Sequence, residues 1–224
     1  MGVETERRWK IDVVPASKIH FSKILPRRGP CYEVLESLRR DGWQLPLIIR
    51  PLRENPEEYE IIDGALRRWA CKEDQPVLVE IRYGVKDSDV FRIREATFKR
   101  KQRTTYQKAN FYFQWVQTIS KERGKNGAQG RVARIANMRE GEISQYLAIH
   151  RTFKELERLQ ISANINLSAL KNQSINKLYE FSKLRGNQDL LEIASELAQH
   201  PNMPIRRLRR RVKEKTGKHA RKLR

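Results

Sequence analysis

The chain has 224 residues, and 47 Lys and Arg against 27 Asp and Glu give it a formal net charge of +20. A charge of that size favours a polyanionic partner, with nucleic acid as the default candidate. It carries no apolar run near the roughly 20 residues that span a bilayer and no apolar signal-peptide core, and its two cysteines form no CxxC pair. We therefore expect a cytoplasmic protein with no membrane partner, structural zinc or disulfide framework.

The first hundred residues mix strand and helix signals. Extended segments are predicted at 9–14 (WKIDVV), 18–21, 46–50 (PLIIR), 59–62 (YEII) and 76–83 (PVLVEIRY). A helix is predicted at 32–40, ending at Asp41-Gly42. Strands that alternate with helices indicate an α/β domain, to which we assign residues 1–86.

The segment DGALRRWAC, residues 63–71, follows an apolar strand and begins a helix at once. Gly64 permits a tight turn between the strand and the helix. Because the first amides of a helix lack intrahelical partners, the segment suggests an anion-binding site beside Arg67 and Arg68. The alternative is an ordinary turn before an exposed helix. Because short glycine motifs match often by chance, this stretch alone favours the ordinary turn.

Strand signals disappear beyond residue 87. Tyr106, Ala109, Phe113 and Val116 share one helical stripe within predicted linking helices at 87–123, and the aromatic cluster FYFQW there is interpreted as core packing. The glycine-rich KERGKNGAQG interrupts this pattern. Residues 124–200 are assigned to a second, helical domain.

Residues 131–151, RVARIANMREGEISQYLAIHR, predict two helices joined by a turn that contains Gly141. In a helix-turn-helix the second helix lies in the major groove and its early residues reach base edges. The first helix is expected to bury Val132, Ile135 and Ala136. A plain helical hairpin explains the pattern equally well. The candidate DNA-contacting residues of this segment are Arg131, Arg134, Glu142, Ser144, Gln145, His150 and Arg151.

The last segment, residues 201–224, is strongly basic: from Ile205 onward eleven Lys and Arg stand against the single acid Glu214. Ile205, Leu208 and Val212 predict a helix docked by one thin apolar edge, and the remainder from Thr216 is expected to be a disordered tail. Charge of one sign repels itself without a counter-charge, which favours DNA contact over a merely solvated surface. The candidate residues are Arg206, Arg207, Arg209, Arg210 and Arg211.

Taken in order, these features resemble the ParB partition-protein family over roughly residues 9–214. The resemblance rests on DGWQLPLIIRP at 41–51 and on YEIIDG with its arginine-bearing helix at 59–70. The phosphate motif of that family runs Gly-Glu-Arg-Arg; here Gly64 and Arg67 match its first and last positions, and Ala65 and Leu66 replace the middle two. The implied fold is an α/β N-terminal ParB/sulfiredoxin-like domain followed by an all-α helix-turn-helix domain, mixed α+β overall.

The resemblance also implies a nucleotide, typically CTP, that controls a clamp closing around DNA. The metal-ligand motif Glu-Asn-x-x-Arg of the family corresponds to KRKQR at 99–103, where Lys99 and Arg100 provide no oxygen ligands for Mg²⁺. Either these cations bind the phosphates of the nucleotide directly, or this domain has lost nucleotide binding and KRKQR faces DNA. We expect no metal and weak or absent CTPase activity. The implied phosphate-binding residues are Gly64, Arg67, Arg68, Arg100 and Arg103.

The function predicted from these features is non-enzymatic binding of double-stranded DNA in plasmid or chromosome partition or genome organisation. A ParA-like ATPase and a second copy of the chain are the further partners implied. No dimerisation segment is recognisable after Val212, so a homodimer would use the N-terminal domain or the helical half. The alternative is an enzyme of the same fold, a free-serine kinase or a nuclease. Leu66 stands where the kinase histidine would be, and the carboxylates lack a compelling metal-site spacing.

Overall fold

The computed structural model describes residues 9–25, 32–42, 45–100, 103–159, 167–184 and 186–222, without the side chains of 34, 39, 97–100 and 218–222. Contacts divide the chain into two units, Met1–Phe98 and Lys99–Arg224, which are considered separately. The finer division into four segments remains a prediction. No helix of the described residues is long and apolar enough to cross a bilayer.

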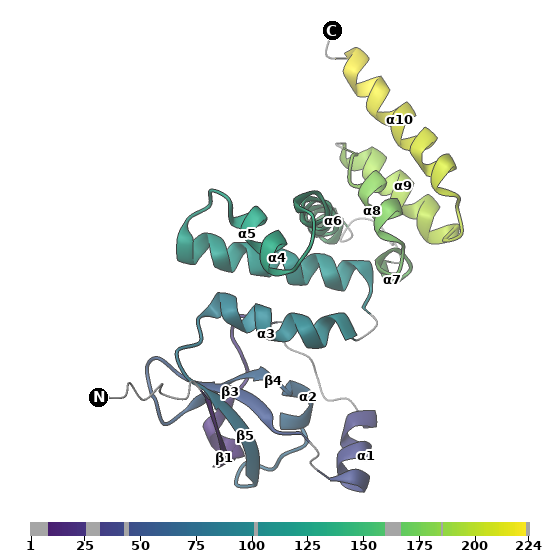
Figure 1. Ribbon diagram of the computed structural model, residues 1–224. Helices are drawn as coiled ribbons and strands as arrows, with labels where there is room; N and C mark the ends of the chain where they lie inside the picture. Colours follow the sequence, from purple (N-terminus) through teal and green to yellow (C-terminus); the bar gives the residue numbers. More distant parts are fainter. Residues whose placement is uncertain are drawn as a thin grey trace. The chain divides into compact units, whose positions relative to one another are not determined.

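The first unit is built around a five-stranded sheet with the order β1-β5-β3-β4-β2 (Figure 1). The two outer pairings are β1 with β5, antiparallel, and β2 with β4, parallel; in the middle β3 runs parallel to β5 and antiparallel to β4. The elements are β1 (Trp9–Pro15), the 3-10 helix η1 (Ala16–Lys18), β2 (Ile19–His20), α1 (Tyr32–Asp41), β3 (Leu47–Pro51), β4 (Tyr59–Asp63), α2 (Ala65–Arg68), β5 (Pro76–Arg82) and α3 (Asp87–Arg100).

One face of the sheet carries the core of this unit. Val77, Val79 and Ile81 alternate along β5 with more exposed residues, and their side chains are fully buried with Leu47 and Ile49 of β3. This period of two is the pattern of a strand with one buried face. It explains why β5 is recognisable in the sequence, whereas β3 and β4 are recognisable from their short apolar runs.

The second unit is entirely helical among the residues described. Its first helix begins at a capping box, in which the side chains of Thr104 and Gln107 each accept the other residue's backbone N–H. The same helix buries Phe111 and Trp115 in the core, as expected. The elements are α4 (Thr105–Arg123), α5 (Ala128–Ile135), α6 (Glu140–Leu159), α7 (Leu167–Lys171), α8 (Ile175–Phe181), α9 (Asn187–Gln199) and α10 (Ile205–Lys222).

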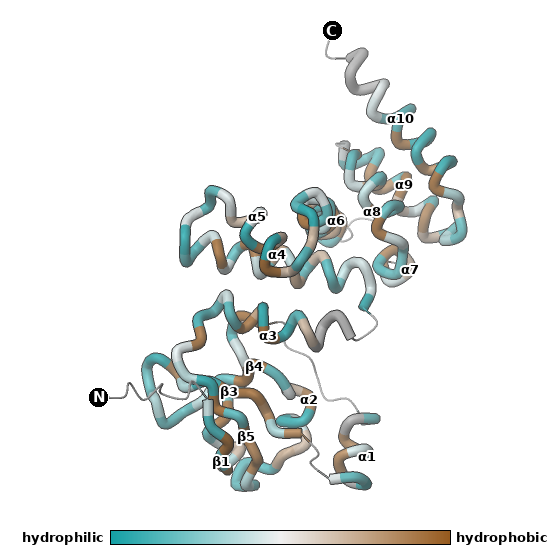
Figure 2. Tube along the Cα trace, in the orientation of Figure 1, coloured by the Kyte–Doolittle hydropathy of each residue, from teal (hydrophilic) through white to brown (hydrophobic). Residues whose placement is uncertain are grey.

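Three expectations for this unit are wrong. Ile135 is 43% exposed, because α5 turns Val132, Ala133 and Ala136 inward instead. Gly141 lies within α6 rather than in the turn before it. The chain does not become disordered at Thr216: α10 continues to Lys222, and Thr216 Oγ1 donates to Val212 O at 3.0 Å. Figure 2 shows the apolar and polar residues that alternate along the first turns of α10.

Candidate nucleic-acid interface

The connection between α5 and α6 is short and tightly bonded. Asn137 takes a left-handed conformation with φ of 51°, and the Met138 N–H donates to Ala133 O at 2.9 Å, which closes the end of α5. The start of α6 is closed by Glu142, whose Oε2 accepts the Arg139 N–H at 3.1 Å. Four residues, 136–139, therefore separate two helices whose ends are both satisfied.

The position of α6 is fixed by its apolar side. Ile143 and Leu147 are buried, and α4 packs against both α5 and α6. At its first turn, Gln129 Nε2 donates to Glu140 O at 3.1 Å, which ties α5 to the beginning of α6. The opposite side of α6 is thereby held outward on a rigid pair of helices.

The exposed side of α6 carries part of the predicted DNA-contacting set. Ser144 and Arg151 are exposed and lie seven residues apart, on one helix face, and Gln145 is half-buried beside them. Arg134 of α5 is exposed as well. Arg131 is half-buried and donates through Nη1 to Arg123 O at 3.2 Å, so it closes the end of α4.

His150 does not fit the predicted role. Its side chain is 4% exposed, and its ring stacks on Phe113 with the ring centres 3.8 Å apart. Burial, assisted by Lys154, lowers the pKa of His150 to about 4, so the ring is neutral at pH 7. We therefore remove His150 from the DNA-contacting set and assign it to the core. Glu142 serves as the cap of α6.

The basic helix α10 has an inner side that is paired with acids of α8 and α9. Four of its cations have carboxylate partners on these helices within 4 Å, and Leu208 and Val212 are buried between them. The cation and carboxylate partners are Arg207 with Glu196, Arg209 with Glu180, Arg211 with Glu192 and Glu196, and Lys215 with Asp189 and Glu192. Much of the self-repulsion expected from the sequence is thus neutralised within the protein.

The outer side of α10 carries cations without such partners. Arg206, Arg210 and Lys213 are exposed, and none of them makes an ion pair with a described residue. Their spacing of four and three places them on one helical face. The predicted set therefore has two parts. Arg206 and Arg210 are available to bind phosphate, whereas Arg207, Arg209 and Arg211 form ion pairs with carboxylates of α8 and α9.

In the first unit, Gly64 is required by geometry. Its φ is +98°, and a Cβ there would lie 2.5 Å from Leu47 Cδ2, so the turn between β4 and α2 needs glycine. The helix that follows has only four residues, Ala65–Arg68, and both Arg67 and Arg68 direct side-chain N–H groups at backbone carbonyls. Arg67 Nη1 donates to Leu45 O and Pro46 O, and Arg68 Nε donates to Ile19 O at 3.1 Å.

The charge on Arg67 is only weakly compensated. Its acceptors are neutral carbonyls, it forms no ion pair with a described residue, and burial lowers its pKa despite the nearby charge of Asp63. Of the other residues in the predicted phosphate set, the side chain of Arg100 lies outside those described, and Arg103 belongs to the second unit, just before α4. Their grouping with Gly64 and Arg67 remains a prediction.

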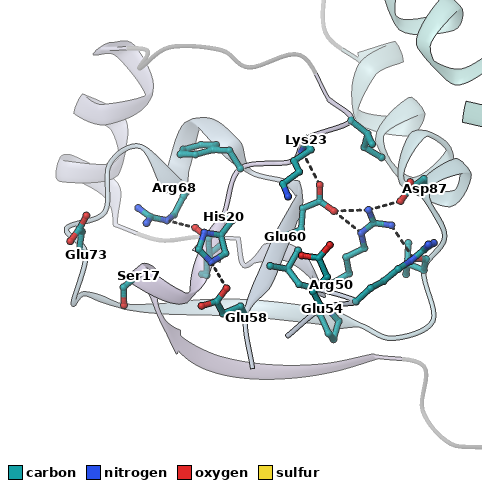
Figure 3. A pocket seen from close by; sticks show the side chains of 17 residues that line it. Ser17, His20, Lys23, Arg50, Glu54, Glu58, Glu60, Arg68, Glu73 and Asp87 are labelled. Atoms are coloured by element: carbon teal, nitrogen blue, oxygen red, sulfur yellow. Dashed lines mark hydrogen bonds and ion pairs between the residues drawn. The ribbon is translucent and has the colours of Figure 1, made fainter. Parts of the chain in front are cut away.

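A cleft of about 910 Å³ opens elsewhere in the first unit, and Figure 3 shows its lining. At one end Arg50 donates to Glu60 Oε2 through Nε at 2.9 Å and pairs with Asp87 at 2.7 Å. Near the other end His20 pairs with Glu58, and Arg68 is the one lining residue from the predicted phosphate set. Five basic and five acidic side chains line the cleft, so it offers no net positive charge for a polyanion.

Sequence reasoning missed the ion pairs of this cleft and of α10. Arg50 and Glu60 each interrupt an apolar strand, and a charged residue inside a buried strand signals an internal ion pair. Burial alone would lower the pKa of Arg50, but Glu60 and Asp87 outweigh it and raise that pKa. The acids of α9 recur at 189, 192 and 196, a helical spacing that also marks one charged face.

No protein-family model matches the sequence, and no curated protein matches it. Solved structures do match, among them two with TM-scores above 0.5. One is the C-terminally truncated chromosome-partitioning protein ParB from Caulobacter crescentus complexed to the centromeric parS site, at 15% identity and TM-score 0.53, with 91% of this chain and 99% of that chain covered. The other is a Pnob8-like ParB-N domain, at 10% identity and TM-score 0.59, with 91% and 97% covered.

The chain has a ParB-like fold. The expected architecture, an α/β unit followed by a helical unit, is confirmed by this likeness, and the structure adds that the sheet has five strands. A third solved structure, the same truncated Caulobacter ParB complexed with CTP-gamma-S, matches at 17% identity over 84% of this chain and 98% of that chain. Its TM-score of 0.34 is too low to support a statement about nucleotide binding here.

Proposed function

We propose that this ParB-like protein binds double-stranded DNA through a helix-turn-helix formed by α5 and α6. The observation that carries the proposal is the start of α6, where the exposed Ser144 and the half-buried Gln145 follow a tight connection, while Ile143 and Leu147 are buried and hold the helix in place. A helix held in this way can enter the major groove, where Gln bonds adenine edges and Ser bonds either base type.

Phosphate contacts would come from cations that are exposed and lack ion-pair partners among the described residues. Arg134 and Arg151 flank the proposed reading face, and Arg206, Arg210 and Lys213 form the outer side of α10. Such contacts hold a protein in register on the duplex without reading its sequence. The net charge of +20 supports the same assignment, because it favours association with a polyanion.

The test is selection of bound sequences from a random duplex pool at moderate salt, with the wild type and with a Ser144→Ala, Gln145→Ala double variant. The wild type should recover a sequence motif that the double variant loses. The matched control is Lys154→Ala, an exposed position nine residues beyond Gln145 on α6, which should leave the motif intact. Equal enrichment of all sequences by the wild type would refute site-specific recognition and leave only charge-driven binding.

A nucleotide such as CTP at the turn that contains Gly64 is the second part of the proposal. Support comes from Arg67, a half-buried guanidinium that donates to neutral carbonyls. Burial lowers its pKa although the charge of Asp63 lies nearby, and a bound anion would stabilise its charged form. Arg68, Arg100 and Arg103 are proposed as further phosphate partners. With KRKQR in place of the acidic motif, we propose binding with weak or absent CTPase activity and no metal.

Isothermal titration with CTP tests this part. Arg67→Ala should abolish the binding heat, and Arg67→Lys should retain part of it, because a lysine preserves the charge but not the fork of donors. Affinity for duplex DNA without nucleotide should be the same in both variants. No binding heat with the wild type would refute a nucleotide site, and equal loss of DNA affinity in Arg67→Ala would assign Arg67 a structural role.

The cellular role that we propose is plasmid or chromosome partition or genome organisation at the nucleoid, with a ParA-like ATPase as a candidate partner. Support comes from the ParB-like fold, one of whose solved examples is a chromosome-partitioning protein complexed to a centromeric site. Stimulation of such an ATPase by this chain and duplex DNA together would test the partnership.

A further inference from the structure

The strand β1 forms one edge of the sheet and carries exposed apolar side chains. Among the described residues it pairs with β5 alone, at the end of the strand order β1-β5-β3-β4-β2 (Figure 1). Trp9, Ile11 and Val13 are 52%, 51% and 58% exposed, and Leu78, opposite Val13 on β5, is 39% exposed. An edge strand with an apolar face is a template for pairing with another strand.

The open edge of β1 is defined by the backbone. The Val13 N–H donates to Asp12 Oδ1 at 2.8 Å, so it is directed away from β5. In an antiparallel ladder, residues that bond one neighbour alternate with residues whose backbone groups face the other side. Trp9, Ile11 and Val13 therefore present their N–H and C=O groups at the open edge.

The sequence of β1 is complementary to itself when run antiparallel. With Ile11 opposite Ile11 of a second copy, Lys10 faces Asp12 and Trp9 faces Val13, and the two-fold axis generates each pair twice. The residues with outward backbone groups then oppose one another, as a hydrogen-bonded ladder requires. Opposite charges and an aromatic side chain facing a β-branched one are favourable cross-strand pairs.

Charge also favours this strand register over the two registers that are shifted by two residues. Sliding the strands by two residues in either direction keeps the outward groups opposed, but it places Lys10 against Lys10 or Asp12 against Asp12. Like charges directly opposite each other are destabilising. In the single chain Lys10 and Asp12 bond each other at 2.7 Å while their side chains remain 52% and 42% exposed, so their charged groups are available for exchange between two copies.

We propose that two copies of this chain dimerise by antiparallel pairing of β1 with β1, centred on Ile11, which joins the two sheets into one. On pairing, the ion pair between Lys10 and Asp12 within each strand is replaced by two ion pairs between the strands, each joining Lys10 of one copy to Asp12 of the other. It frees the Val13 N–H to donate to the backbone of the second copy and merges the two exposed apolar faces. This inference does not depend on DNA or nucleotide binding.

The test is sedimentation velocity of the full chain over a concentration series without DNA. The wild type should dimerise. Lys10→Glu and Asp12→Lys should each weaken the dimer at least about tenfold, because one reversed charge converts two favourable pairs into two repulsive ones. Lys18→Glu, which reverses an exposed charge just after β1, is the matched control and should leave the dimer unchanged.

Two rescues make the test specific for register. The double variant Lys10→Glu, Asp12→Lys should restore the homodimer, and an equimolar mixture of the two single variants should form a heterodimer. Circular dichroism of each variant checks that it is folded, and hydrogen exchange should show the Ile11 and Val13 amides protected only in the dimeric samples. A wild type that stays monomeric, or a dimer indifferent to these reversals, would overturn the proposal.

Discussion

The two sides of α10 give the sharpest test of how this chain uses its charge. Neutralising three cations on the outer side should remove up to three phosphate contacts, while neutralising three on the inner side should remove none. The outer variant is Arg206→Gln, Arg210→Gln and Lys213→Gln; the inner variant is Arg207→Gln, Arg209→Gln and Arg211→Gln. Both variants lower the net charge by three on the same helix, so they differ only in which side is changed.

The magnitude follows from counterion release. The slope of log affinity against log salt changes by about 0.9 for each phosphate contact on duplex DNA, so the outer variant should flatten it by about 2.7. The inner variant should leave the slope of log affinity against log salt unchanged. It should instead lower the free energy of unfolding, by up to about 1 kcal/mol for each exposed ion pair lost. Fluorescence anisotropy with a labelled duplex from 50 to 200 mM salt measures the slopes, and urea unfolding measures the stabilities.

Equal slopes in the two variants would refute this division of α10. If both were flattened alike, the protein would respond to total charge and not to a particular face. If neither were flattened, α10 would have no contact with DNA, and the phosphate contacts would have to come from α5, α6 or elsewhere.

Three further predictions follow from the structure. Ser144→Ala and Gln145→Ala should each cost about 1–3 kcal/mol of preference for the selected site over a scrambled duplex in competition binding, with little change on the scrambled duplex itself. Gly64→Ala should lower the free energy of unfolding by about 2 kcal/mol or more in urea titrations, because φ is positive and the new Cβ would meet Leu47; unchanged stability would contradict that geometry. Because His150 has a pKa of about 4 when folded against about 6.5 when unfolded, its stabilising effect is complete above pH 6.5 and is lost as the pH falls towards 4. Unfolding free energies should therefore drop by about 2 kcal/mol more between pH 7 and pH 5 in the wild type than in His150→Gln, and parallel pH profiles would refute the assignment.

Elements with a strong local signal could be predicted from the sequence. The strands β1, β3, β4 and β5 follow from apolar runs and alternation, and α4, α6 and α9 follow from helical stripes. Gly64 was recognisable because few other residues allow a turn directly from strand to helix. These features depend on neighbours within a few residues, which the sequence displays.

Side-chain roles in the candidate site were harder to predict, because they depend on which helix face meets another element. His150 and Arg151 are adjacent, yet one is buried against Phe113 and the other is exposed. Ile135 has the composition of a core residue, but the short α5 turns it outward. Periodicity defines a stripe along a helix, and only packing decides where the stripe ends.

The sequence by itself determined the excess of positive charge, the order of strands and helices and the segments in which DNA-contacting residues should be sought. The tertiary structure decided which charges remain available. It placed carboxylates of α8 and α9 against four cations of α10 and left Arg206, Arg210 and Lys213 in solvent. The physical reason is that charge adds along a chain regardless of conformation, whereas neutralisation requires two groups within about 4 Å, and residues far apart in sequence meet only in the folded protein.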